Sequence, residues 1–427
     1  MILEELMHGS ESKGTTASFE EVRDFYQRMP YPAPLTSLDE HRELYRNPAR
    51  RRAQFHLLWP NKRLRGDLEI LVAGCGTSQA ARYALREPEA RVTAIDISEM
   101  SLRHTRALKQ KYDLKNLELH QLSIESIGQL GRTFDQIVCT GVLHHLPDPD
   151  LGLRALRDVL KPDGAMNLMV YAPYGRAGIY MMQEYCRLLG LSSSDDDLKE
   201  LGRALEALPA NHPIANAMRA GLDFKHPDAL ADALLHPLDR AYSVPQLFEW
   251  LRNCGLSFGR WVEQAPYLAE CGIIAKTPHA NRLASMPAEL QYAAVELFRG
   301  TFARHKLIAY RSDHDGDSQP ISFAGDRWRE YVPIRLLSTV CVRERLPPGS
   351  VAVLINRAHQ FTDLLLLVDK LEERLLSAID GKRTLSQILI QTGNDHNEQK
   401  ALRFFERLWQ YDQIVFDASA ANRLSHG

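Results

Sequence analysis

Two glycines and an aspartate carry the first chemical signal in this chain. An apolar run, Leu68–Ala73, leads straight into the turn Gly74–Gly76, where two glycines let the backbone approach a ligand closely. Asp96 follows a second apolar run about twenty residues further on. A carboxylate there can accept hydrogen bonds from both hydroxyls of a ribose, or it can cap the next helix, a role for which Ser98 competes. Together, these features predict a site for a ligand that contains adenosine.

Two further segments extend this site. Ser123 and Ile124 follow the apolar run Leu117–Gln121, where a polar side chain can reach an adenine amino group and an apolar one can pack on the ring. The segment Phe134–Leu146 is a strand followed by a loop that begins at Thr140. The order of all the segments at these spacings is more specific than any one of them.

Gln79 separates this pattern from the dinucleotide-binding fingerprint. That fingerprint, G-x-G-x-x-G, needs a third glycine for close packing of helix on strand, and Gln79 stands in its place. The turn therefore argues against NAD. An NAD-dependent oxidoreductase is kept as a rival hypothesis that binding of NADH would test.

A parallel sheet is the element that would bring these segments together. Short apolar runs alternate with amphipathic helical stretches over residues 68–171, a pattern typical of a parallel sheet covered by helices on both faces. Ligands bind at the carboxyl ends of such strands. We therefore predict an α/β fold.

With these motifs the chain resembles the class I S-adenosylmethionine (SAM)-dependent methyltransferases, in particular the group with G-V-L-H-H-L (Gly141–Leu146) and L-K-P-D-G (Leu160–Gly164) signatures. The resemblance is strong over roughly residues 67–171. It implies a Rossmann-like sheet and SAM as the cofactor, with the ribose on Asp96 and the sulfonium beside the loop at Thr140. The residues it implies at the cofactor are Gly74, Cys75, Gly76, Gln79, Asp96, Ile97, Ser123, Ile124, Thr140, Gly141 and Val142.

Methyl transfer asks little of the protein, because the sulfonium is already a strong electrophile and the work is alignment and desolvation of the acceptor. A base is needed only if the acceptor starts protonated. His144 and His145 are the candidate bases near neutral pH, and Tyr31, in a proline-rich arm, could flank the sulfonium. The alternative for all three is a packing or structural role.

Candidates for binding the acceptor follow the fifth strand and precede the helix at Val244. Arg240 could hold a carboxylate or phosphate of the substrate, or it could form a structural pair with Asp239. The candidate acceptor-binding residues are Tyr174, Arg176, His236, Arg240 and Tyr242.

The length of the chain predicts several domains. They are an N-terminal arm and helices over the cofactor site (1–66), the SAM-binding core (67–174), a helical insertion or lid (175–243), the end of the sheet (244–278) and a C-terminal α+β domain (279–427). One helix is expected from about Leu38 to Trp59. The sheet is expected to end in two antiparallel strands, Leu256–Glu263 and Ala269–Lys276.

The end of the C-terminal domain loosely resembles a winged-helix module. Three helices are expected at Leu365–Ile379, Leu385–Thr392 and Glu398–Tyr411, followed by a strand at Ile414–Phe416. Such a module could hold a peptide substrate or shape a homodimer. Its charges are not clearly basic, which argues against nucleic acid as the acceptor.

Composition limits the partners further. The formal net charge of −2 offers no general attraction to nucleic acid or to an anionic membrane. Glu4 and Glu5 stand where a signal peptide needs basic residues, and no apolar run is long enough to cross a bilayer, so we expect a cytoplasmic protein without a membrane partner. The six cysteines lack zinc-ligand spacing, and no metal site is predicted.

Two hypotheses of function follow. The first is methyl transfer from SAM to a small-molecule or peptide acceptor, with the C-terminal module docking a protein substrate as one variant. The second is a non-catalytic regulator that binds SAM or S-adenosylhomocysteine (SAH). Labelled SAM separates them, because a regulator binds SAM but transfers no label.

Overall fold

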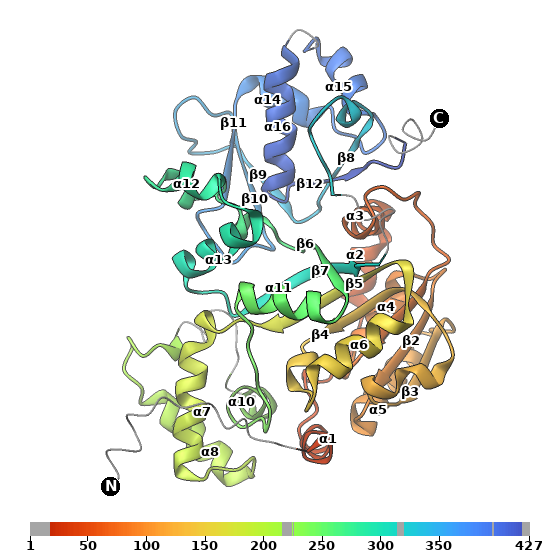
Figure 1. Ribbon diagram of the computed structural model, residues 1–427, viewed down its shortest axis with the longest axis vertical. Coiled ribbons are helices and arrows are strands. Elements are labelled where there is room, and N and C mark those ends of the chain that lie inside the picture. The colour runs from red at the N-terminus through yellow and green to blue at the C-terminus, as the bar shows by residue number, and fades with distance from the viewer. Residues whose placement is uncertain (1–17, 216–223, 225, 314–319, 395–396, 421–427) are drawn as a thin grey trace.

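The computed structural model describes residues 18–215, 224, 226–313, 320–394 and 397–420 (Figure 1). Its centre is a seven-stranded sheet in the order β3-β2-β1-β4-β5-β7-β6. β1 to β5 are parallel neighbours, and β7 pairs antiparallel with both β5 and β6. The strands are β1 Glu69–Ala73, β2 Arg91–Asp96, β3 Leu117–Gln121, β4 Phe134–Thr140, β5 Leu160–Tyr171, β6 Leu256–Trp261 and β7 Arg304–Arg311.

Helices cover both faces of this sheet, as the alternating pattern predicted. On β1, Ile70 and Val72 pack in one hydrophobic core, while Leu71 and Ala73 point into the other. The helices over the first core are α3 Pro48–Leu58, α4 Gln79–Arg86 and α5 Glu99–Lys111, and those over the second are α6 Pro149–Val159 and α11 Val244–Asn253. The predicted Rossmann-like α/β fold is confirmed.

The prediction of a single helix from Leu38 to Trp59 is wrong, because Asn47 separates two helices. α2 spans Asp39–Arg46, and α3 begins at Pro48, whose ring cannot continue a helix but fits its first turn. The Asn47 side chain caps α3 by accepting a hydrogen bond from the Ala49 amide, with 3.0 Å between oxygen and nitrogen.

The strand expected at Ala269–Lys276 is also wrong. This stretch contains a turn and a short 3₁₀ helix, and β6 pairs instead with β7, which begins about forty residues after β6 ends. β7 sits between β5 and β6 in the sheet, so the expected boundary between residues 278 and 279 cuts the sheet too early.

Helices of the expected insertion pack together beside the N-terminal helix. They are α7 Ala177–Leu189, α8 Asp195–Glu206 and α10 Pro227–Leu234, and their shared core includes Phe25 of α1, which spans Phe19–Arg28. Figure 1 shows this group next to the carboxyl ends of the central strands. The insertion and the N-terminal helix are therefore placed to cover the same edge of the sheet.

The C-terminal part is α+β with two small sheets, β11-β10-β9 and β12-β8. Its elements are α12 Ala280–Ala284, α13 Ala288–Arg299, β8 Val332–Arg335, β9 Thr339–Val342, β10 Ala352–Asn356, β11 Leu365–Val368, α14 Lys370–Ser377, α15 Leu385–Thr392, α16 Glu398–Gln410 and β12 Ile414–Asp417. Among the described residues, 3₁₀ helices include η1 Ile124–Leu130, η2 Leu143–His145, η3 Tyr174–Arg176, η4 Ala265–Tyr267, η5 Ile274–Lys276 and η6 Arg327–Glu330.

The winged-helix resemblance is not confirmed. The helix expected to start at Leu365 begins only at Lys370, after Asp369 caps it, and the residues before it form β11. β12 pairs with β8, which precedes the helices, and no hairpin follows α16 in the part of the chain that the structure describes.

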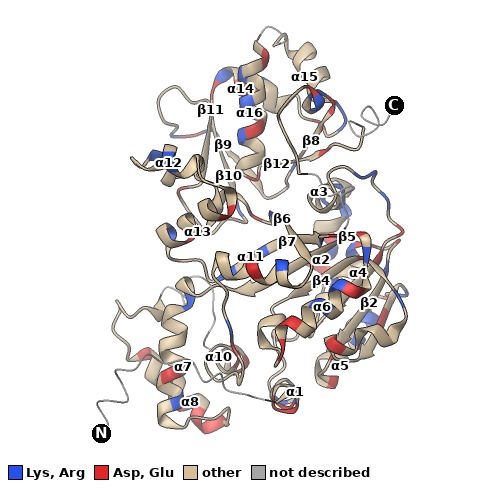
Figure 2. Cartoon of the chain, viewed as in Figure 1, with Lys and Arg blue, Asp and Glu red and all other residues tan. Residues whose placement is uncertain are grey.

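Charges of both signs are interspersed on helices such as α6, α11 and α16 (Figure 2). Within the described ranges, every helix is too short or too polar to traverse a lipid bilayer.

Candidate functional site

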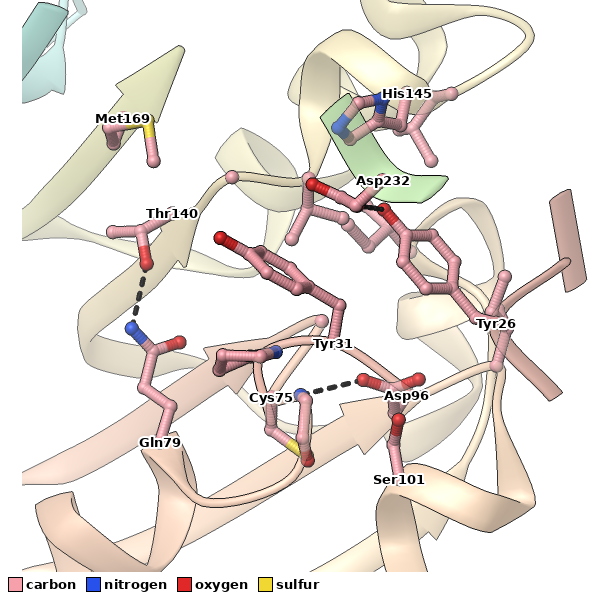
Figure 3. Close-up of a pocket in the computed structure, with 18 of the residues that line it drawn as sticks. Tyr26, Tyr31, Cys75, Gln79, Asp96, Ser101, Thr140, His145, Met169 and Asp232 are labelled. Atoms are coloured by element: carbon pink, nitrogen blue, oxygen red, sulfur yellow. Dashed lines mark hydrogen bonds between the residues drawn. The ribbon is translucent and has the colours of Figure 1, made fainter. Parts of the chain in front are cut away.

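A cavity of about 560 Å³ opens at the carboxyl edge of the sheet, within the size range of small-molecule sites (Figure 3). The glycine turn after β1, the end of β2 and the loops after β3 and β4 form one side of it. The N-terminal helix and arm, the start of the insertion and α10 form the other. The cavity therefore joins the predicted cofactor residues to segments far away in the sequence.

The glycine turn has the geometry that its sequence predicts. Gly74 and Gly76 adopt left-handed φ angles of +67° and +56°, which side chains disfavour. A Cβ atom on Gly74 would lie 2.4 Å from Cγ2 of Val142. The turn can therefore form only without a side chain at this position.

Asp96 holds this turn and still faces the cavity. Its Oδ2 accepts a hydrogen bond from the Gly76 amide at 2.8 Å, and its Oδ1 accepts one from the Ser98 amide at 2.9 Å. Ser98 itself caps α5, which settles the competition for that role. Burial raises the pKa of Asp96, while these amide donors oppose the shift. Each carboxylate oxygen can accept a second hydrogen bond, as two ribose hydroxyls would require.

Replacing Asp96 by alanine should weaken SAM binding by roughly 1.5–3 kcal/mol, the range for hydrogen bonds to a charged group. Calorimetric titration of the variant with SAM measures the change. Glu99→Gln, at a half-buried position in the next helix that does not line the cavity, is the control and should bind SAM normally. An unchanged affinity in Asp96→Ala would contradict the ribose assignment.

At the adenine end of the cavity, the polar residue differs from the one that the sequence predicted. Ile97 and Ile124 line the cavity as predicted, but Ser123 does not, and its hydroxyl donates to Ser126 at 3.1 Å. Glu125 lines the cavity instead, and its Oε2 is buried without a hydrogen-bond partner. A carboxylate with a free oxygen can accept a hydrogen bond from an adenine amino group. Sequence reasoning missed it because the chain turns into a 3₁₀ helix at Ile124.

The remaining predicted cofactor residues all line the cavity, namely Cys75, Gln79, Thr140, Gly141 and Val142. The Gln79 amide donates to the Thr140 hydroxyl at 2.7 Å and so ties the start of α4 to the loop after β4. Burial raises the pKa of the Cys75 thiol, which therefore stays neutral. The structure thus brings these residues to one wall.

The two histidines lie differently from the expectation of a base poised near neutral pH. His145 lines the cavity, but its Nδ1 is bound to the Leu238 carbonyl at 2.5 Å, and burial lowers its pKa to about 4. His144 does not line the cavity; its buried ring lies between His145 and Tyr171, and its pKa is lowered further. Both rings are therefore neutral at pH 7.

The buried neutral His145 should make the fold sensitive to acid. In the unfolded chain its pKa returns to 6.5, so below that pH the unfolded state takes up a proton that the folded state refuses. The folded state therefore has its full stability, as far as His145 is concerned, above pH 6.5, and it loses stability as the pH falls towards 4. We expect the loss of unfolding free energy between pH 7 and pH 4.5 to be roughly 2–3 kcal/mol smaller in His145→Asn.

Urea unfolding of the full chain at the two pH values measures this difference. Asparagine keeps an amide donor for the Leu238 carbonyl but does not titrate. His120→Asn changes a half-exposed histidine and should follow the unsubstituted chain. Equal acid sensitivity of His145→Asn and the unsubstituted chain would show that His145 does not carry the effect.

Tyr31 lies where the sequence placed it, over the cofactor wall. Its carbonyl oxygen lies 3.3 Å from the position of a Cβ on Gly76, and Figure 3 shows its ring inside the cavity. The hydroxyl of Thr77 donates to the Pro32 carbonyl at 2.8 Å and holds the arm there. Burial raises the pKa of Tyr31, so its hydroxyl stays protonated.

Only one of the five predicted acceptor-binding residues lines the cavity, Arg176. Its guanidinium is buried, pairs with Asp239 at 2.5 Å and lies 3.5 Å from the centre of the Tyr171 ring. The Asp239 partner predicted for Arg240 thus belongs to Arg176.

The other four have neighbours outside the cavity. Arg240 donates to the carbonyls of Leu146 and Pro147, and Tyr242 stacks on Trp250 with 4.7 Å between ring centres. Tyr174 is exposed on η3, and Nδ1 of His236 accepts from the Leu238 amide at 3.0 Å. In the structure, the polar residues between His236 and Tyr242 thus make hydrogen bonds and ring contacts within the protein, and they do not line the cavity.

Residues at the acceptor end that the site prediction left out come from distant segments. They are Asp232, Arg304 and Gln360, and Tyr26 and Tyr171 line the same end. Gln360 belongs to the loop between β10 and β11, so the C-terminal part also lines this cavity. No sequence motif marks them, because only the packing of α1, α10 and the C-terminal part brings them together. Within the described ranges, no cluster of three or more histidine, cysteine or acidic side chains could hold a metal ion.

Comparison with known proteins agrees with this geometry. Residues 71–166 match the family model of a methyltransferase domain. The uncharacterized protein syc1184_c of Synechococcus is 39% identical over 58% of this chain and 61% of its own length. The ubiquinone biosynthesis O-methyltransferase of Neisseria meningitidis serogroup C is 31% identical over 24% of this chain and 42% of its own. The chain thus spans about three fifths or less of these relatives.

A solved structure shares the fold over most of the chain. PKMT2 from Rickettsia typhi, determined in complex with AdoHcy, superposes with a TM-score of 0.59 at 15% identity, covering 87% of this chain and 75% of that one. This likeness supports the fold, including the part beyond the sheet. Fold, cavity and domain match together identify S-adenosylmethionine as the cofactor of the methyltransferase domain at residues 71–166.

Proposed function

We propose that this chain transfers the methyl group of SAM to a small-molecule or peptide acceptor by direct displacement at the sulfonium. One observation carries the proposal: the cavity that contains the glycine turn and Asp96 is also lined by Tyr31, Tyr171 and Arg176, which lie outside the predicted cofactor residues, and we assign these three to a second, acceptor end. A protein that only sensed SAM would not need this space.

The second end suits an acceptor that must lose water before it reacts. Its tyrosines offer apolar rings and hydroxyl groups, and Arg176 is already neutralised by Asp239. Covering segments from α1, α10 and the C-terminal part exclude solvent around the reacting atoms, which favours methyl transfer over hydrolysis. The contribution of Gln360 supports a role of the C-terminal part in shaping the acceptor site.

The test uses SAM labelled in its methyl group and a bacterial extract, separated after reaction into small molecules and polypeptides. We expect label in one of the two fractions, and the fraction shows which acceptor class is used. Asp96→Ala at the same SAM concentration should transfer less. A chain that binds SAM in calorimetry but labels neither fraction would be a regulator, and the proposal would fail.

A further inference from the structure

Asp232 is a buried carboxyl group at the acceptor end of the cavity, on helix α10. Only 4% of its surface is exposed, and its Oδ1 accepts a hydrogen bond from the Tyr26 hydroxyl at 3.2 Å. In the part of the chain that the structure describes, its other oxygen has no hydrogen-bond donor. Figure 3 shows that oxygen directed away from Tyr26, into the cavity.

Among the described residues, no cation is paired with Asp232 alone. The buried Arg176 guanidinium acts on Asp232, but it is held by Asp239, whose carboxylate also accepts from Gln183. Within the described ranges, the charged and titratable groups that interact with Asp232 are Tyr26 from α1, Tyr31 from the arm, Tyr171 from β5, Arg176 from η3 and Asp239 after α10. Burial, the largest effect, and the charge of Asp239 raise its pKa to about 7, while Tyr26 and Arg176 oppose the rise.

Apart from Glu125, which lies at the adenine end, the other described groups that line the cavity are poor proton acceptors at neutral pH. Tyr31 and Tyr171 keep their own protons because burial raises the pKa of both. His145 has one ring nitrogen engaged by Leu238 and a pKa lowered to about 4. Asp96 already accepts hydrogen bonds from two backbone amides, and its remaining lone pairs are assigned to the ribose hydroxyls. A base with a pKa near the working pH and a free oxygen is the favourable case for general catalysis.

We propose that Asp232 accepts the proton of the methyl acceptor. This inference rests on the proposed function. The lone pair of an acceptor atom that carries hydrogen attacks the methyl carbon of SAM, and a bond forms between them. The bond between that carbon and sulfur breaks, and its electrons stay on sulfur to give SAH. The acceptor's proton passes to Oδ2 of Asp232, while Tyr26 positions the carboxyl group through Oδ1.

A first experiment needs no acceptor, because SAM carries a sulfonium charge that SAH lacks. An opposite charge nearby favours an ionised carboxylate, so SAM should gain affinity over SAH as Asp232 loses its proton. Calorimetry with SAM and with SAH from pH 5.5 to 8.5 should show this ratio rising about ten-fold or more. Asp232→Asn should abolish the rise, and Tyr26→Phe should move its midpoint to higher pH.

Asp228→Asn is the matched control, because Asp228 lies one turn earlier on α10 and does not line the cavity. It should follow the unsubstituted chain. A rise that persists unchanged in Asp232→Asn would show that another group titrates beside the sulfonium and would overturn the proposal.

A second experiment measures transfer of labelled methyl groups to the extract at saturating SAM. Asp232→Asn should lower the rate by about 10²–10⁴-fold, the usual contribution of a general base. Asp232→Glu should restore part of it. No transfer by the unsubstituted chain would overturn the proposed function and this role together, whereas transfer that Asp232→Asn leaves unchanged would overturn this role alone.

Discussion

Replacing Asp239 by asparagine is expected to lower the free energy of unfolding by about 3–5 kcal/mol, because it leaves the Arg176 guanidinium buried without a counter-charge. The two side chains are only 3% and 2% exposed, and they meet at 2.5 Å. Asparagine keeps the volume of the site but removes the negative charge. Urea unfolding of the full chain at pH 7 measures the change.

An exposed ion pair provides the control for this prediction. Arg154 and Asp150 lie 3.5 Å apart, with both side chains 47% exposed, so Arg154→Gln should cost less than about 0.5 kcal/mol. If Asp239→Asn cost no more than this control, the buried pair would not be desolvated as the structure shows.

A double variant separates the cost of an unpaired charge from loss of packing. In Asp239→Leu combined with Arg176→Met, no charge is left buried, and apolar side chains fill the space. We therefore expect the double variant to recover most of the stability lost in Asp239→Asn. Its SAM affinity shows in addition how far the pair matters for the cofactor, since Arg176 lines the cavity.

The cofactor half of the site could be predicted because its residues follow directly after strands. Gly74, Asp96 and Thr140 each stand at the carboxyl end of a short apolar run, and parallel pairing brings those ends to one edge. Local sequence thus carries the information that positions them. Ser123 was the exception, because the choice between it and Glu125 depends on how a 3₁₀ helix turns.

The acceptor half could not be predicted, because it depends on contacts between distant segments. Asp232 lies in a short helix, Pro227–Leu234, that reads as a surface helix until α7, α8 and α1 pack around it. Its hydrogen bond to Tyr26 joins residues 206 positions apart. Gln360 reaches the cavity from beyond β7. Local sequence patterns do not predict contacts between residues so far apart in the chain.

The errors in the fold have a similar cause. β7 follows the whole insertion in the sequence, yet it lies between β5 and β6 in the sheet. The residues of β7 alone do not indicate which strands it pairs with. The prediction of a helix from Leu365 is wrong because Leu365–Val368 is uniformly apolar, and a short apolar run does not distinguish strand from helix. Its alternating burial exists only once it pairs with β10.

Replacing Gly74 by alanine is expected to lower the free energy of unfolding by about 2–5 kcal/mol. The left-handed φ of +67° costs an ordinary residue about 1–2 kcal/mol. The new methyl group would also meet Val142, with only 2.4 Å to Cγ2 and 2.8 Å to Cγ1, and crowding of this kind costs about 1–3 kcal/mol. Urea unfolding measures the sum, and calorimetry with SAM measures the effect on the cofactor.

Gly190→Ala isolates the conformational part of this cost. Gly190 has nearly the same φ, +66°, but no heavy atom lies within 4 Å of a Cβ placed there, so only the left-handed penalty of about 1–2 kcal/mol applies. Gly74→Ala combined with Val142→Ala should fall back towards that value, because the crowded methyl groups are gone. If Gly74→Ala were no less stable than Gly190→Ala, the turn would have room for a side chain. The close approach of backbone to cofactor, on which SAM binding depends, would then lose its structural basis.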